Sequence, residues 1–462
     1  MEQTTAKKNK YEIDMCNGTI MDKLISFSLP LMLSGILQLM FNAVDIIVVG
    51  RFSGSQALAA VGSTSALINV FTNLFIGISL GANVLTARFY AAGREKEVSE
   101  TVHTAITLAL VSGIVMALVG LVFSKGALAL MGTPDDVIGL SALYMRIYFL
   151  GMPFFMLYNY GAAILRAVGD TKRPLLFLMI AGVINACLNM VLVIVFKLGV
   201  AGVAIATVIS QMISCVLVLR CLCRSESSYR LRFSELGMKG YYLKQIFSVG
   251  VPAGIQSTVI NFSNVLLQSS VNSFGSTAMA GYTAANNLLG FLYVSVNSIT
   301  QACMSFTSQN YGVGKLKRMD RVLADCMILS VVVAVVLGCI CYGFGPEILQ
   351  IYTEDAEVIA CGMEILAYTT ITYFLCGWMD LFPGALRGMG YSAVPMVLSV
   401  IGTVGTRVVW IFDIFPYHRS LAILFISYPA SWIITIVLQV ICFYFVRRRV
   451  HRRSQALAGQ EA

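Results

Sequence analysis

The sequence predicts an all-α polytopic membrane protein, with about twelve transmembrane helices in two pseudo-symmetric six-helix bundles. Three observations support this prediction. Hydrophobic residues make up 58% of the chain and charged residues only 12%, whereas soluble domains average about 25% charged residues. The second half of the chain repeats the first, and most basic residues lie in the tails and in alternate loops.

The repeat has an offset of 221 residues: Arg166, Gly169 and Pro174 return as Arg387, Gly390 and Pro395. Pro30 and Pro252 form a further pair, at an offset of 222. Solenoid repeats have periods of about 20–50 residues, so this chain is better described as a duplicated half-protein. In a very apolar chain, such a duplication is typical of two-lobed secondary transporters, whose substrate path lies between the lobes.

Apolar stretches of about 20 residues, the length that crosses a bilayer, recur along both copies. In the first copy they lie near 24–49, 57–81, 99–123, 137–158, 173–196 and 199–220. In the second copy they lie near 242–272, 278–304, 322–344, 357–380, 394–415 and 420–446. We therefore expect an N-lobe over 24–220 and a C-lobe over 242–446, joined by a cytoplasmic connector over 221–241. A polar tail over 1–23 precedes the lobes, and a basic tail over 447–462 follows them.

The basic residues indicate which side of the membrane each loop faces. Of the 32 lysines and arginines, 26 lie in the tails, in the loops after even-numbered helices and at the adjoining helix ends. Cytoplasmic loops carry such an excess, so we expect both termini in the cytoplasm and the chain in the cell (inner or plasma) membrane. The net charge of +9 then reflects topology and contact with the lipid bilayer, and no nucleic-acid partner is expected. We also expect no cofactor and a monomeric state.

Two motif-like stretches lack the surroundings that their chemistry requires. Gly312–Lys315 resembles a phosphate-binding loop, but Leu316 follows where a Ser or Thr must contact magnesium. Gly77–Gly81 matches the GxSxG pattern of hydrolases, which requires a strand-to-helix turn, yet it lies within an apolar span. The same five residues are better explained as a small-residue face for helix packing. We therefore expect no enzymatic activity, and uphill transport would have to use an ion gradient.

Polar side chains inside the predicted spans are functional candidates, because a carboxylate at mid-bilayer costs roughly 2.5–3.5 kcal/mol on insertion scales. Asp45 lies about 7–8 Å below the outer end of the first helix. Asn185 and Asn189 form an i, i+4 pair on the fifth helix, and Thr207 lies on the sixth helix, also in the outer half. This cluster suits a sodium ion or a carboxyl group that titrates. The alternatives are ordinary interhelical hydrogen bonds and a static pair between Asp45 and Arg146.

The second copy repeats only part of this pattern. Asn42 has a counterpart in Asn264, but Asp45 meets Leu267 or Gln268, so the acid exists in one copy only. This asymmetry favours a task given to one lobe. We expect the substrate pathway to include four polar residues: Asn42, Asn264, Gln268 and Asp380.

The C-lobe also contains an acid and a base at similar depth, Glu364 on the tenth helix and Arg407 on the eleventh. Leaving either charge unpaired in an apolar setting would cost several kcal/mol. We therefore expect Glu364 and Arg407 to form a structural salt bridge, with substrate contact as the alternative.

These residues resemble those of the MATE (multidrug and toxic compound extrusion) transporters, over residues 20–446. The resemblance is carried by Asp45 with Val49–Arg51, by Leu165–Thr171 with Pro174, by Gly199–Thr207 and by Leu386–Gly390. Each motif alone is weak, but together they are specific. The resemblance implies twelve helices in two bundles, alternating access, and export of mostly cationic, amphipathic compounds in exchange for H⁺ or Na⁺. A flippase for lipid-linked sugars or other lipids, which shares this general architecture, is the alternative.

The resemblance to the prokaryotic branch also implies a cation site. It uses the aspartate of helix 1, an Asn-x-x-x-Asp pair on helix 5 and the threonine of helix 6. In this chain the matching positions are Asp45, Asn185, Asn189 and Thr207. Asn189 departs from the pattern, since the family usually has a second aspartate there. A site with one carboxylate would be weaker for Na⁺, or would work by protonation of Asp45 alone.

Overall fold

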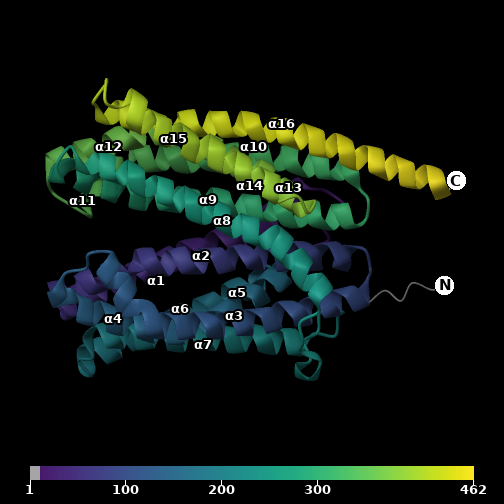
Figure 1. Ribbon diagram of the computed structural model, residues 1–462, viewed down its shortest axis with the longest axis horizontal. Helices are drawn as coiled ribbons and strands as arrows, with labels where there is room; N and C mark the ends of the chain where they lie inside the picture. The colour runs from purple at the N-terminus through teal and green to yellow at the C-terminus, as the bar shows by residue number, and fades with distance from the viewer. Residues whose placement is uncertain (1–10, 462) are drawn as a thin grey trace. The chain divides into compact units, whose positions relative to one another are not determined.

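The structure is a computed structural model that describes residues 11–461, and in this range it contains helices and no strand (Figure 1). The helices of the first half are α1 (Met21–Phe52), α2 (Ser55–Ala91), α3 (Glu95–Leu130), α4 (Asp135–Leu150), α5 (Met152–Ala167), α6 (Lys172–Met190), the π-helix η1 (Val191–Val195) and α7 (Gly199–Cys223). A short 3-10 helix, η2 (Phe233–Glu235), lies in the connector.

The second half follows the same order. Its helices are α8 (Gly240–Asn272), α9 (Ser276–Gly312), α10 (Leu316–Gly343), α11 (Gly345–Gln350), α12 (Ala356–Thr369), α13 (Tyr373–Gly388), α14 (Ala393–Ser399), the π-helix η3 (Val400–Gly405), α15 (Thr406–Val409), the π-helix η4 (Trp410–Ile414) and α16 (Leu421–Glu461).

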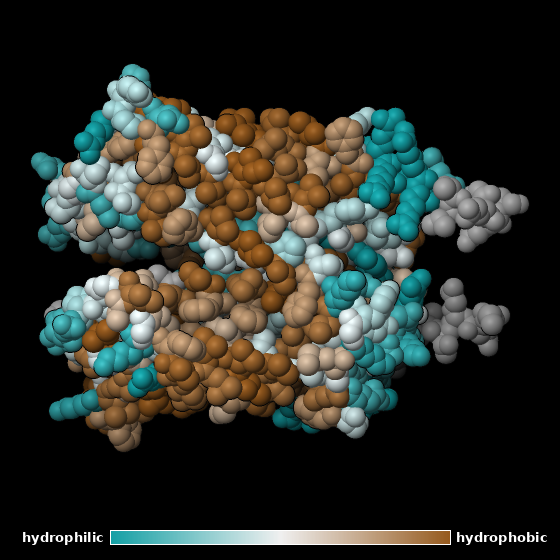
Figure 2. All heavy atoms as spheres, viewed as in Figure 1, coloured by the Kyte–Doolittle hydropathy of each residue, from teal (hydrophilic) through white to brown (hydrophobic). Residues whose placement is uncertain are grey.

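The helices have the length and polarity of membrane spans. Within the described residues, eight segments are long and apolar enough to cross a membrane, and two bent pairs raise the number to ten. The more polar helices α8 and α9, of 33 and 37 residues, complete the predicted series of twelve. On the face shown in Figure 2, hydrophobic residues cover the middle of each unit and hydrophilic residues lie toward the helix ends. The predicted all-α polytopic fold is confirmed.

Each bent pair occupies the same place in its half of the chain. Helices α4 and α5 meet at 47°, and α12 and α13 meet at 51°. The first bend lies at Pro153, near the start of α5. Proline interrupts a helix because it lacks a backbone N–H donor and restricts the conformation of the preceding residue. The second bend contains three threonines, Thr369, Thr370 and Thr372, whose hydroxyls donate to the carbonyl four residues earlier at 2.7, 2.6 and 2.8 Å. Such bonds often bend helices.

The described residues form two compact units. The first contains residues 11–14 and Leu33–Gly254, and the second contains Met15–Met32 and residues 255–461. The division therefore falls inside α1 and inside α8, two residues after Pro30 and Pro252. Each unit has its own buried core: Phe149 and Tyr160 belong to that of the first, and Leu366 and Phe425 to that of the second.

A glycine face joins α2 to the start of α8 within the first unit. A Cβ atom at Gly77 would lie 2.3 Å from the Cα atom of Gly254, and one at Gly81 would lie 2.2 Å from the carbonyl oxygen of Ile246. Only glycine permits this approach of the two backbones. The structure confirms that Gly77–Gly81 is a helix-packing face.

The repeated loops after α5 and after α13 explain why two of the recurring residues are glycines. Gly169 and Gly390 have φ angles of +97° and +91°, a conformation that glycine adopts without strain. In the first of these loops Asp170 is fully buried and pairs with Arg173. Burial raises the pKa of Asp170, while the charge of Arg173 opposes this shift.

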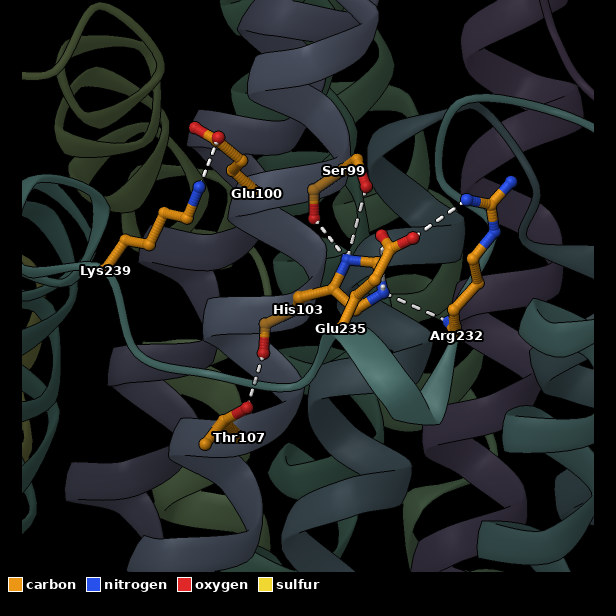
Figure 3. A network of polar contacts seen from close by, with 7 residues as sticks. All are labelled: Ser99, Glu100, His103, Thr107, Arg232, Glu235 and Lys239. Atoms are coloured by element: carbon orange, nitrogen blue, oxygen red, sulfur yellow. Dashed lines mark hydrogen bonds and ion pairs between the residues drawn. The ribbon is translucent and has the colours of Figure 1, made fainter.

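The connector between α7 and α8 docks on α3 (Figure 3). The backbone N–H of Arg232 donates to Nε2 of His103 at 3.0 Å, while Nδ1 of His103 lies 2.7 Å from the carbonyl oxygen of Ser99. In this arrangement Nε2 of His103 is the acceptor for the connector backbone. Next to it Glu235 accepts from Arg232 at 2.8 Å, and this hydrogen bond lowers the pKa of Glu235.

Candidate cation site

Helices α1, α6 and α7 bring the four predicted residues together. Asn189 donates through Nδ2 to Asp45 Oδ1, and the same nitrogen lies 3.2 Å from Asn185 Oδ1. The hydroxyl of Thr207 lies 3.4 Å from Asp45 Oδ2 and 3.5 Å from Asn185 Nδ2. Three helices thus meet at one carboxylate.

The cluster is withdrawn from solvent. The exposed fraction is 8% for Asp45, 5% for Asn185 and 0% for Asn189. The amide oxygen of Asn189 is buried and has no hydrogen-bond partner among the described residues. An unpaired amide oxygen is free to coordinate a cation or to accept a hydrogen bond.

The local sequence explains how α6 approaches α1 at this point. Gly182 lies one turn before Asn185, and a Cβ atom there would lie 1.8 Å from the ring of Phe41 on α1. The absent side chain thus leaves space for that ring. The π-helix η1 begins two residues after Asn189, and π-helical turns inside helices are frequent at functional sites.

The alternative pair between Asp45 and Arg146 is not present in the part of the chain that the structure describes. Asp45 makes its hydrogen bonds with Asn189 and Thr207, and the side chain of Arg146 is exposed. All hydrogen-bond partners of the Asp45 carboxylate are therefore neutral. In a low-dielectric setting such a group holds its negative charge at a cost.

The four substrate-pathway candidates lie in both units: Asn42 belongs to the first, and Asn264, Gln268 and Asp380 belong to the second. Asn42 is exposed, and Asp380 is partly buried on α13. Gln268 lies 3.1 Å from Asn272 on the same helix. Asn264 accepts a hydrogen bond from Arg407 at 2.7 Å. Their part in transport stays a prediction.

Arg407 does not pair with Glu364 among the described residues. Its guanidinium donates to Ser263 at 2.9 Å and to Asn264 at 2.7 Å, and it lies over the ring of Tyr428, with Cζ 4.7 Å from the centroid. Depth along two helices does not determine which way their side chains point. Arg407 faces α8 and α16, whereas Glu364 lies on α12.

Comparison with known proteins identifies the family of the chain. The MatE family model matches the chain twice, over residues 30–191 and 252–412. The chain belongs to the MATE family. The two matches begin at Pro30 and Pro252, so they coincide with the duplicated halves. Since this is a family of transporters, the chain is a multi-pass membrane transporter.

Relatives in this family include proteins named for drug resistance. The chain is 32% identical over 434 residues to the "Probable multidrug resistance protein YoeA" of Bacillus subtilis, covering 92% of this chain and 93% of the relative. It is 22% identical over 382 residues to the "Multidrug export protein MepA" of Staphylococcus aureus, covering 82% of this chain and 84% of the relative. A solved structure described as the outward-facing conformation of a multidrug resistance MATE family transporter has a TM-score of 0.86, with 19% identity and 97% and 99% coverage.

Proposed function

We propose that this MATE transporter is a secondary active antiporter that exports amphipathic, mostly cationic drugs or toxic compounds in exchange for H⁺ or Na⁺. It would act by alternating access, as a monomer in the plasma membrane with both termini in the cytoplasm. The observation that carries the proposal is the buried carboxylate of Asp45, which has only neutral hydrogen-bond partners. The names of its relatives, which concern multidrug resistance and export, support the substrate class.

The neighbours of Asp45 suit a small cation. A buried carboxylate without a basic partner is stabilised when it takes up a proton or a metal cation. Oxygen atoms are the ligands of hard cations, and Asn185, Thr207 and the unpaired oxygen of Asn189 supply them here. The same atoms serve a proton equally well, because the amide oxygen of Asn189 can accept from a protonated Asp45.

Coupling requires that the cation and the exported compound favour different conformations, because a ligand shifts an equilibrium only by its differential affinity. Neutralising Asp45 would change its hydrogen bonds with Asn189 on α6 and Thr207 on α7. Pro30 in α1 and the π-helix η1 after α6 are positions at which these helices can bend. Cation uptake would therefore alter how α1 packs against its neighbours.

The test is dye efflux measured in inverted vesicles, with pH and Na⁺ gradients imposed separately. The proposal expects a fluorescent organic cation to be accumulated against its gradient when at least one of the two ions is supplied. Accumulation under neither gradient, in vesicles that contain folded protein, would contradict antiport. Scrambling of fluorescent lipids by the same vesicles would favour the flippase alternative.

A further inference from the structure

The second unit has a polar cluster in the place that the repeat assigns to the Asp45 cluster. At the 221-residue offset, Thr207 and Ser210 of α7 correspond to Tyr428 and Ser431 of α16. Asn185 corresponds to Thr406, the residue before Arg407, and Asn42 corresponds to Asn264 at an offset of 222. The side chains at or beside these second-copy positions surround Arg407.

Arg407 is held by neutral groups from two helices. Its Nη1 donates to Ser263 Oγ at 2.9 Å and to Asn264 Oδ1 at 2.7 Å, both on α8. Its Nε lies 3.4 Å from Ser431 Oγ, and its Cζ lies 4.7 Å from the ring centroid of Tyr428, both on α16. The guanidinium is thus fixed in orientation.

The charge of this guanidinium is not balanced by its neighbours. Arg407 is 3% exposed, and no carboxylate forms an ion pair with it within the described residues. The hydrogen bonds to neutral oxygens and the contact with one aromatic ring stabilise the guanidinium, but they do not neutralise its positive charge. Its Nη2 donates no hydrogen bond within residues 11–461. One donor group therefore stays available.

The backbone around Arg407 has a second unusual feature. The four-residue helix α15 that carries it is flanked by the π-helices η3 and η4. In the first copy, η1 lies at the equivalent place beside Asn189. π-helical segments of this kind occur often at functional sites, and here both copies have one next to the polar cluster.

We infer that the Arg407 cluster binds the anionic group of a transported amphipathic compound, a carboxylate or a similar oxyanion. The inference rests on the proposed function, because the ligand is taken to be a compound that the protein exports. Guanidinium groups bind carboxylates through charge-assisted hydrogen bonds, and an intramembrane charge is best explained by a partner that neutralises it. The two units would then have opposite polarity: Asp45 for the coupling cation, Arg407 for the anionic group.

The test uses binding to the purified full-length protein in phosphatidylcholine nanodiscs, without any gradient. The probes are a rhodamine dye with a free carboxylate and its ethyl ester, which differ only in the anionic group. Wild type is expected to bind the carboxylate dye more tightly than the ester. Arg407→Gln should weaken binding of the carboxylate dye about 10-fold or more and leave the ester within about 2-fold. Equal losses for both dyes, or no loss for either, would overturn the inference.

One further variant keeps the test decisive. If Arg407→Gln fails to fold, Arg407→Lys can replace it, since lysine retains the charge and should still favour the carboxylate dye. A wild-type protein that does not prefer the carboxylate dye would overturn the inference. The binding assay imposes no ion gradient, so it reports on the Arg407 cluster independently of gradient-driven efflux. Loss of gradient-driven efflux with an intact dye preference would thus separate a failure of coupling from a failure of this site.

Discussion

At the scale of single residues, we propose that Asn189 sets the cation preference of the candidate site. It donates to the carboxylate of Asp45 through its amide nitrogen, and its own oxygen is buried without a hydrogen-bond partner among the described residues. Because the Asn189 amide is neutral, a single proton on Asp45 neutralises the whole cluster. A second carboxylate at this position would supply further negatively charged oxygen ligands, and one Na⁺ can contact both carboxylates, whereas one proton neutralises only one of them.

Asn189→Asp should therefore strengthen the dependence of efflux on Na⁺ relative to pH. The two carboxylates would repel each other, and binding of Na⁺ between them would relieve the repulsion. Initial rates of dye transport in vesicles with separate gradients measure the change. The neutral variant Asn189→Ser should keep the wild-type ion preference, although at a lower rate. An unchanged preference in Asn189→Asp would contradict a role for this cluster in ion binding.

The sequence allowed the residues of the cluster to be predicted, because depth along a helix follows from residue count. Asp45, Asn185, Asn189 and Thr207 are all predicted to lie in the outer half of their helices, and the structure brings them within hydrogen-bond distance. Partners around Arg407 could not be predicted in this way, since depth does not determine rotation about a helix axis. The internal repeat contained the missing signal: Ser431 and Tyr428 are the second-copy positions of Ser210 and Thr207.

At the scale of secondary-structure elements, the contact between α2 and α8 depends on the absence of side chains. Gly77→Ala should destabilise the protein, because its Cβ would lie 2.3 Å from backbone atoms of Gly254 that cannot rotate away. Overpacking of this kind costs typically about 1–3 kcal/mol. Gly62→Ala, in the same helix, is the matched control, since nothing lies within 4 Å of its Cβ position. Equal melting temperatures of the two variants in detergent would contradict the close contact.

The connector offers a second prediction at this scale. His103→Leu should release the segment over 224–239, because the partly buried backbone N–H of Arg232 would lose its acceptor (Figure 3). An unsatisfied buried donor costs about 1–3 kcal/mol, so hydrogen exchange in connector peptides should become about 10-fold faster. His103→Gln, which keeps an acceptor near the position of Nε2, should show a smaller change. Equal exchange in wild type and both variants would show that the connector does not depend on His103.

Several element features lay beyond sequence reasoning. The twelve apolar stretches predicted the spans, but the bend between α12 and α13 contains no proline and coincides with threonine hydroxyls that bond to the preceding turn. Likewise, no residue pattern marks the π-helices η1, η3 and η4. Such features arise from competition between backbone and side-chain hydrogen bonds, and packing decides the outcome.

At the scale of the whole molecule, the chain consists of two units whose division falls inside helices. The first part of α1 belongs to the second unit, and the first part of α8 belongs to the first, with Pro30 and Pro252 just before the division. Proline weakens a helix at these points by removing one backbone hydrogen bond. Asp45 lies beyond the proline, in the part of α1 that belongs to the first unit. We therefore expect a change in how Asp45 is bonded to alter the part of α1 that follows Pro30.

The most direct measurement of the central claim is efflux by Asp45→Asn in inverted vesicles under imposed pH and Na⁺ gradients. Asparagine keeps the size of the side chain and one acceptor oxygen but removes the charge, so the variant should insert, fold and bind dye. Without a charge to neutralise, it should show no gradient-driven accumulation under either ion. Accumulation at the wild-type rate under a pH or Na⁺ gradient would contradict the assignment of Asp45 as the coupling residue.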